Sequence, residues 1–242
     1  MKAILTGHTR GLGAAIAEQL LARGIPILGL ARSGNATLAA QYPSLLTEVA
    51  LDLSDPAALL ATLGGEAVES FVAGAQSLLL INNAGMLQPV GRVETQDAAA
   101  IARTVSLNVA APLILTSAIA AQLGGRPCRV LHVSSGAGRN AYPGWSIYCA
   151  TKAALDQHAR AVALDQSPSL KICSVAPGVV DTDMQTEVRA IPPEQFPMRD
   201  RFIKMKNEGT LTPPSVAAKK LLDYLLSDAF GIAPLADVRE LD

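Results

Sequence analysis

The stretch Thr6-Gly7-His8-Thr9-Arg10-Gly11-Leu12-Gly13 decides the fold, because three glycines stand between a short apolar run and a helical pattern. In such a turn Gly7 permits a tight bend, Gly11 lets the backbone approach a pyrophosphate, and Gly13 lets the helix pack closely. The first turn of the helix presents its N–H groups to the anion. The stretch therefore predicts a dinucleotide site, and a plain strand-to-helix turn is the alternative. The residues expected to bind are Gly7, Thr9, Arg10, Gly11, Leu12 and Gly13; His8 is expected to hydrogen-bond within its own turn.

Outward from this turn, short apolar runs alternate with helical patterns, which is typical of βαβ units. Strands are expected at residues 3–5, 26–31, 48–51, 78–81, 129–133 and 171–175, and helices at 13–22, 57–63, 98–123, 148–164 and 217–226. They predict an α/β protein: one doubly wound parallel sheet, a Rossmann fold, with helices on both faces. The length of 242 residues favours a single domain over residues 1–242. Residues 183–214 are rich in proline and charge, and their lack of a clean period indicates a mobile flap.

The composition limits the partners of the chain. A formal net charge of −1 gives no cationic surface for nucleic acid or an acidic membrane, so the expected partners are small molecules. Cys128, Cys149 and Cys173 show no C-x-x-C spacing, which favours reduced thiols over a disulfide framework or a metal site. We expect no signal peptide before the first strand and no membrane span, because no run of 18 apolar residues is free of polar groups. A cytoplasmic protein is predicted.

Polar or glycine-containing motifs follow five of the expected strands. Ligands of doubly wound sheets bind beyond the carboxyl ends of the strands, so these motifs are expected to meet at one site. They are Thr6 and Gly7, then Asp52 and Leu53, then Asn82, Asn83, Ala84 and Gly85, then Ser135, and finally Pro177 and Gly178.

The segment Tyr148-Cys149-Ala150-Thr151-Lys152 supplies a candidate acid. Positions four apart on a helix share a face, so the Tyr148 hydroxyl and the Lys152 ammonium can act on the same small volume. An ammonium about 4 Å away is expected to lower the phenol pKa from about 10 towards neutrality. A phenol of that pKa can donate a proton to a carbonyl oxygen.

The end of the second strand predicts the choice of dinucleotide. An acidic residue there binds a ribose 2′-hydroxyl, but the chain reads Ala31-Arg32-Ser33. Arg32, with Arg10 from the glycine turn, can bind a 2′-phosphate, each charge-assisted bond contributing about 1.5–3 kcal/mol. We therefore expect NADP(H) in preference to NAD(H), by roughly a hundredfold or more. The alternative is that both arginines are only solvated.

With these residues in view, nearly the whole chain resembles the short-chain dehydrogenase/reductase family. A glycine-rich turn, Asn-Asn-Ala-Gly, an isolated asparagine, a serine, Tyr-x-x-x-Lys and Pro-Gly occur in that order. The resemblance implies that Asn108 holds a water for proton relay, Ser135 polarises the substrate carbonyl, Tyr148 is the acid/base and Lys152 holds the ribose. Ser135 is preferred to Ser134 because it stands thirteen residues before Tyr148 (148 − 135). The cofactor contacts that it implies are Ser33, Asp52, Leu53, Asn83, Ala84, Gly85, Pro177, Gly178, Val180 and Thr182.

The stretch from Val179 to Arg189 resembles the benzil reductase and sepiapterin reductase branch, whose members reduce vicinal diketones or pterin side chains with NADPH. Five apolar side chains predict a pocket for a flat or aromatic carbonyl substrate, with packing of the flap as the alternative. They are Trp145, Met184, Phe196, Phe202 and Met205. Asp237 is the nearest candidate for the carboxylate that grips the pterin in sepiapterin reductases, and its local match is poor. The resemblance further implies a homodimer or homotetramer packed through residues 98–123 and 148–164.

Other interpretations of the same residues stay open. Asn108 is also compatible with a polar kink in a helix, Asp52 with an Asx-turn, the Asn82-Asn83 pair with a turn, and Ser134 and Ser135 with a strand cap. The enzyme alternatives are reductases of 3-oxoacyl thioesters, steroid-like substrates or simple alcohols. A non-catalytic NADPH-binding protein is the alternative from another class. A serine hydrolase is disfavoured, because no G-x-S-x-G elbow surrounds Ser135.

Overall fold

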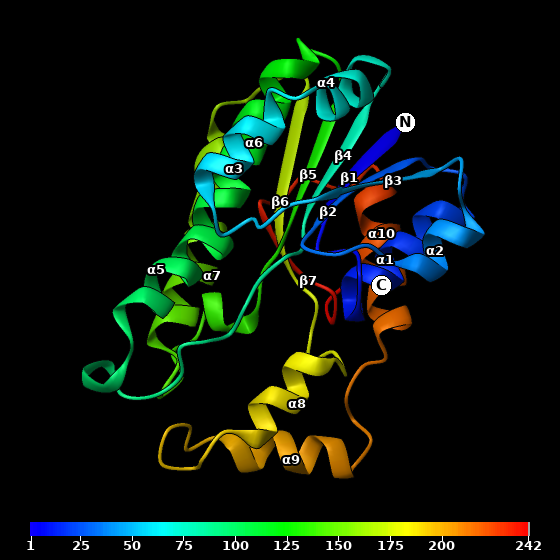
Figure 1. The fold of residues 1–242 in the computed structure, drawn as a ribbon. Helices are drawn as coiled ribbons and strands as arrows, with labels where there is room; N and C mark the ends of the chain where they lie inside the picture. Colours follow the sequence, from blue (N-terminus) through cyan, green and yellow to red (C-terminus); the bar gives the residue numbers. More distant parts are fainter. Residues whose placement is uncertain (242) are drawn as a thin grey trace.

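The computed structural model describes residues 1–241, and a sheet of seven parallel strands runs through it (Figure 1). The strands are β1 (Lys2–Thr6), β2 (Ile27–Ala31), β3 (Leu46–Ala50), β4 (Leu78–Asn82), β5 (Cys128–Val133), β6 (Leu170–Ala176) and β7 (Leu235–Asp237). Their order is β3-β2-β1-β4-β5-β6-β7, so the strand order reverses between β1 and β4. The predicted doubly wound parallel sheet is confirmed.

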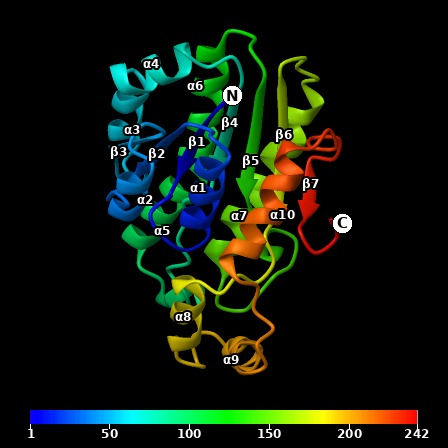
Figure 2. The ribbon, with the colours of Figure 1, turned by 90° about the vertical axis from the view of Figure 1, so that its right-hand side faces the viewer.

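Helices cover both faces of the sheet (Figures 1 and 2). One layer holds α1 (Gly11–Ala22), α2 (Ala36–Gln41) and α10 (Pro214–Leu226). The other holds α3 (Pro56–Leu63), α4 (Glu66–Ala73), α6 (Ala111–Leu123) and α7 (Ser146–Leu164). Each layer buries its own apolar cluster against the sheet, and β2 and β4 are buried along their whole length. This explains why the strands read as continuous apolar runs in the sequence.

Three short elements were not predicted. Asn35 caps the six-residue α2, accepting a 3.1 Å hydrogen bond from the N–H of Leu38. Helix α4 follows the pair Gly64-Gly65, which resembles a loop in sequence. Strand β7 has three residues and forms by pairing with β6. Elements this short cannot show a clear hydrophobic period, so only tertiary contacts specify them.

The helix expected at residues 98–123 is divided in the structure. It consists of α5 (Ala98–Val105), a π-helical turn η2 (Ser106–Ala110) and α6 (Ala111–Leu123). Pro112 lies in the first turn of α6, and because it has no N–H it cannot donate to the carbonyl oxygen of Asn108, four residues earlier in the π-helical turn. This 26-residue run is long and apolar enough to cross a membrane by length and composition, which differs from the sequence expectation. Buried Leu115, Ile119 and Leu123 pack it against the sheet.

The proline-rich stretch of residues 183–214 contains two helices, α8 (Asp183–Ala190) and α9 (Arg199–Asn207). Both lie beyond the carboxyl ends of the strands (Figures 1 and 2). They bury a third apolar cluster that includes Trp145, Tyr148, Val188, Phe196 and Phe202. The stretch is therefore an ordered cover at the end of the sheet where the predicted motifs gather.

Candidate functional site

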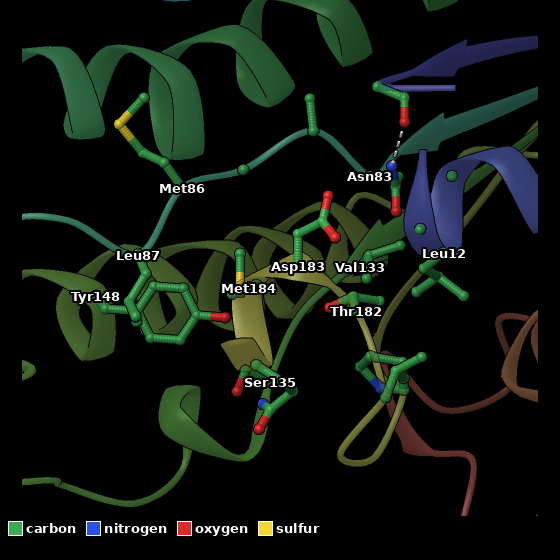
Figure 3. Close-up of a pocket in the computed structure, with 18 of the residues that line it drawn as sticks. Leu12, Asn83, Met86, Leu87, Val133, Ser135, Tyr148, Thr182, Asp183 and Met184 are labelled. Carbon is green, nitrogen blue, oxygen red and sulfur yellow. Dashed lines mark hydrogen bonds between the residues drawn. The ribbon is translucent and has the colours of Figure 1, made fainter. Parts of the chain in front are cut away.

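A cavity of about 1060 Å³ opens at this end of the sheet, and its wall contains nearly all the predicted site residues (Figure 3). Those at the wall are Gly7, Thr9, Arg10, Gly11, Leu12, Gly13, Arg32, Ser33, Asp52, Leu53, Asn83, Ala84, Gly85, Ser135, Tyr148, Lys152, Pro177, Gly178, Val180 and Thr182. Among the predicted catalytic and cofactor-binding residues, Asn108 is the exception and lies behind the wall. Residues from six strand ends and two helices thus converge on one volume.

The glycine turn forms a narrow cradle at the amino end of α1. Gly7 and Gly11 have φ values of +70° and +54°, which other residues adopt only with strain. A Cβ on Gly13 would lie 1.9 Å from the carbonyl oxygen of Gly7, so no side chain fits there. Arg10 at the N-cap makes no side-chain hydrogen bond to the helix, and the first three residues of the helix line the cavity. This cradle fits a dinucleotide pyrophosphate.

The Asn-Asn-Ala-Gly motif supports the cradle from β4. The Asn83 amide donates to the carbonyl oxygens of Thr6 at 3.0 Å and Gly7 at 3.1 Å. The Thr6 hydroxyl oxygen accepts the N–H groups of Asn83 at 2.9 Å and Ala84 at 3.0 Å. Four hydrogen bonds therefore fix the glycine turn to the neighbouring strand end, and Figure 3 draws one of those made by Asn83.

Arg32, Ser33 and Asp52 form the far end of the cavity. The Asp52 carboxylate accepts from the N–H of Ser54 at 2.9 Å and from its hydroxyl at 2.7 Å, so the Asx-turn interpretation describes its contacts. These two hydrogen bonds lower the pKa of Asp52, and Arg32 adds a smaller effect in the same direction. Arg10 lies 3.3 Å from Asp183 at the start of α8, which links the glycine turn to the cover.

Tyr148 and Lys152 lie one turn apart near the start of α7, and both are buried. The Lys152 ammonium donates to the carbonyl oxygen of Val133 at 2.8 Å and stands 5.7 Å from the centre of the Tyr148 ring. Burial raises the pKa of Tyr148 to about 12, and a hydrogen bond to Ser135 acts in the opposite direction. Burial lowers the pKa of Lys152 to about 8, while the charge of Asp156 raises it.

The expectation that Lys152 brings the phenol pKa towards neutrality is therefore wrong for this structure. The ammonium is held by a backbone carbonyl, and burial, which disfavours the charged phenolate, is the largest cause of the raised pKa of Tyr148. Tyr148 keeps its proton at neutral pH, the form in which a phenol can donate to a substrate oxygen.

The two serines at the end of β5 have different partners. The Ser134 hydroxyl donates to Asp156 at 2.7 Å, whereas Ser135 lies with Tyr148 at the cavity (Figure 3). Ser135 also caps the short η3 (Gly136–Gly138) by accepting the N–H of Ala137 at 3.1 Å.

Asn108 lies in the π-helical turn η2, 1 % exposed. Its side chain accepts from the N–H of Met86 at 2.9 Å, and donates to the carbonyl oxygen of Met86 at 2.8 Å and to Thr151 at 3.2 Å. The turn is thus anchored both to the loop after β4 and to α7. π-helical turns of this kind occur often at functional sites.

Asp156 is a buried carboxylate that the sequence did not single out. It accepts the hydroxyls of Ser134 and Ser174, each at 2.7 Å, and pairs with Arg139 at 3.3 Å. It stands one helical turn after Lys152, so it joins the strand ends of β5 and β6 to the helix that carries the candidate acid.

The wall beside Tyr148 is largely apolar. Trp145, Met184, Phe202 and Met205 line it as predicted, together with Leu87. Phe196 does not line it: this side chain is fully buried and stacks on Trp145 from behind, with ring centres 4.4 Å apart. Lining residues outside every predicted motif or stretch include Met86, Arg103, Leu107, Asn140, Tyr142 and Arg239. They carry no motif, because separate segments bring them together only after folding.

Two further expectations need correction. Asp237 is buried, and its carboxylate receives two hydrogen bonds from the Arg239 guanidinium, at 2.9 and 2.6 Å; Arg239, not Asp237, reaches the cavity. His8 does not hydrogen-bond its own turn: its Nε2 lies 2.6 Å from Glu48 on β3. Glu48 is forty residues from His8 in the chain, so only the fold brings the two together. Arg239 is two residues from Asp237, but the sequence does not show that the two side chains pair.

Comparison with known proteins agrees with this geometry. Residues 1–192 match the short chain dehydrogenase family, and the chain belongs to it. Its relatives include a benzil reductase ((S)-benzoin forming) of Bacillus cereus, 37% identical over 99% of this chain and 98% of the relative. A sepiapterin reductase of Meriones unguiculatus is also 37% identical, over 94% and 92%. A crystal structure of a short-chain dehydrogenase/reductase from Burkholderia vietnamiensis is 52% identical, covers 100% of this chain and 98% of that one, and has a TM-score of 0.72.

The family and the branch inferred from the residues are thereby confirmed. The protein is an oxidoreductase of a family that binds a nicotinamide cofactor. Among residues 1–241, no group of three His, Cys, Asp or Glu side chains is placed to hold a metal ion.

Proposed function

We propose that this protein is an NADPH-dependent carbonyl reductase acting on apolar or aromatic ketones, with vicinal diketones first among them. The supporting observation is that one cavity joins the glycine cradle, the Ser135-Tyr148-Lys152 group and an apolar wall. A dinucleotide in the cradle would extend towards Tyr148, and a flat carbonyl compound would rest against the apolar wall beside Tyr148. The two named relatives, a benzil reductase and a sepiapterin reductase, support this substrate class by similarity.

The proposed chemistry needs few groups from the protein. A bound NADPH supplies a hydride to the carbonyl carbon. Ser135 holds the carbonyl oxygen, and Tyr148 donates its phenolic proton to that oxygen. Lys152 holds the ribose hydroxyls and Asn108 holds a water that returns a proton to the site. Helices α8 and α9, which carry residues of the cavity wall, would limit the access of bulk water to the reacting groups.

NADP(H) is proposed over NAD(H) on the charges at the far end of the cavity. Arg32 lies there beside Ser33, and the end of β2 carries no acidic residue. Arg10 is the second candidate, and it would exchange its exposed contact with Asp183 for the phosphate, which costs little because exposed ion pairs are weak. The ratio of kcat/KM for NADPH to that for NADH checks this, and a ratio at or below one contradicts it.

The test of the reaction is a screen of benzil, phenylpropanedione, sepiapterin and acetoacetyl thioesters with NADPH, run on the wild type and Tyr148→Phe. We expect turnover of the diketones, and a loss of roughly 10²–10⁴-fold in the variant with NADPH affinity nearly unchanged. Turnover confined to thioesters would move the protein to that substrate class. Turnover of Tyr148→Phe within tenfold of the wild type would exclude the acid role.

The remaining assignments rest on similarity. We propose one domain over residues 1–242, with residues 183–214 as a flap over the substrate, in the cytoplasm. A homodimer or homotetramer packed through α5, α6 and α7 is proposed, and sedimentation analysis distinguishes it from a monomer.

A further inference from the structure

The His8 side chain is fully buried inside the glycine turn, although a phosphate cradle has no use for an imidazole there. Its Nε2 lies 2.6 Å from Oε1 of Glu48 on β3. Because a carboxylate only accepts, the ring donates from Nε2. The same oxygen accepts the backbone N–H of Asn35, also at 2.6 Å. One carboxylate oxygen therefore joins the glycine turn to the segment that follows β2.

Those two segments carry the residues at the far end of the cavity. Thr9 and Arg10 follow His8 directly, and Arg32 and Ser33 stand just before Gly34 and Asn35. A second bond strengthens the link, since the Asn35 amide donates to the carbonyl oxygen of Thr9 at 3.3 Å. Neither His8 nor Glu48 lines the cavity itself.

The sheet is adapted to accept this ring. Gly29 of β2 pairs in register with Glu48 of β3, so ring and carboxylate meet over the same part of the sheet. A Cβ on Gly29 would lie 2.5 Å from two atoms of the His8 ring. Glycine inside a buried strand is unfavourable and often marks a close approach. The ring's Nδ1 has no hydrogen-bond partner, and burying an unpaired polar atom costs stability. If the ring only filled space, an apolar side chain would therefore be more stable at this position.

We propose that His8 and Glu48 are positioning residues for the 2′-phosphate end of the dinucleotide. They hold the segment of Thr9 and Arg10 beside the segment that follows β2, so that the backbone carrying the two arginines is already in place before the ligand arrives. This inference rests on the proposed NADP(H) preference. Preorganised contacts lose less side-chain and loop freedom on binding, which raises affinity without a new contact.

The test uses calorimetric titration with 2′,5′-ADP, which carries the 2′-phosphate, and with 5′-AMP, which lacks it. The main variant is His8→Ala combined with Gly29→Ala, because the added methyl group refills the space that the ring leaves. We expect its affinity for 2′,5′-ADP to fall about tenfold and its affinity for 5′-AMP to stay within about threefold. Glu48→Ala should behave in the same way, and kcat at saturating NADPH should be unchanged in both.

Glu48→Gln is the matched control, since its amide oxygen still accepts from His8 and Asn35; its preference for 2′,5′-ADP should remain near that of the wild type. Thermal unfolding of each variant shows that it is folded, and Glu48, whose side chain is 23% exposed, tolerates replacement. If the wild type itself binds both ligands equally, the NADP(H) preference is wrong and this inference falls with it. If the wild type discriminates and the double variant and Glu48→Ala do so equally, only the positioning role is wrong.

Discussion

Asp156 shows how one residue behind the site can set the behaviour of another within it. It lies one turn from Lys152, and its charge raises the pKa of that lysine while burial lowers it. It also holds Ser134, next to the candidate catalytic Ser135. Sequence motifs led to Ser135 and Lys152 but not to Asp156, because its partners on β5 and β6 meet it only in the folded chain.

We predict that Asp156→Asn moves the alkaline limb of the pH profile of kcat/KM to lower pH by about one unit. The sign follows from the lost negative charge, which no longer favours protonated Lys152, so the lysine releases its proton below the present value of about 8. Asp165→Asn, an exposed change at the end of the same helix, is the control and should leave the profile unchanged. If the alkaline limb of kcat/KM does not move in Asp156→Asn, Asp156 does not set the pKa of Lys152.

Among the elements, the cover α8–α9 was the least predictable from sequence. The βαβ rhythm predicted strands β1 to β6 and the five helices expected between and after them to within three residues, because buried strands and amphipathic helices have strong periods. Helices α8 and α9 each bury a single residue, Val188 and Phe202, so neither shows a stripe. What holds them is a small aromatic cluster around Trp145, assembled from segments far apart in the chain.

Phe196→Ala tests this account of the cover. Phe196 is fully buried and stacks on Trp145 with an interplanar angle of 4°. We expect a loss of about 3 kcal/mol in the free energy of unfolding and a higher KM for aromatic ketones, with NADPH affinity unchanged. Phe71→Ala on α4 is the comparison truncation, since Phe71 is partly buried against a core cluster and does not line the cavity; it should reduce stability and leave KM alone. Steady-state kinetics measures KM and urea unfolding measures stability. An unchanged KM in Phe196→Ala would show that the cover does not shape the substrate site.

At the scale of the whole molecule, Lys152 places a cationic side chain in a largely apolar interior. Lys152 is 5% exposed and has no carboxylate partner within ion-pair distance among residues 1–241. Its ammonium is compensated by one carbonyl oxygen and by the more distant Asp156. The folded state therefore carries an electrostatic cost at neutral pH that the unfolded chain does not.

This cost predicts how stability depends on pH. The pKa of Lys152 is about 8 in the fold and 10.5 in its ordinary state, so between these values the unfolded chain binds more protons and the free energy of unfolding rises with pH. Tyr148 acts oppositely between pH 10 and about 12, and Cys128 from pH 9 upward, because burial raises their pKa values. Comparison with Lys152→Met isolates the contribution of the lysine. The free energy of unfolding of the wild type minus that of the variant should rise by up to about 3 kcal/mol between pH 8 and pH 10.5.

Urea unfolding at a series of pH values from about 7 to about 10 measures the difference, with exposed Lys171→Met as the control that should give a flat line. The comparison tests whether burial in the fold lowers the pKa of Lys152. If burial in the fold is the cause, the slope appears in the protein alone and shrinks when NADPH binds, because ribose hydroxyls would then share the ammonium. A flat difference without cofactor would mean that water reaches Lys152, and the enclosed acid site described here would be too wet for proton transfer directed by Tyr148.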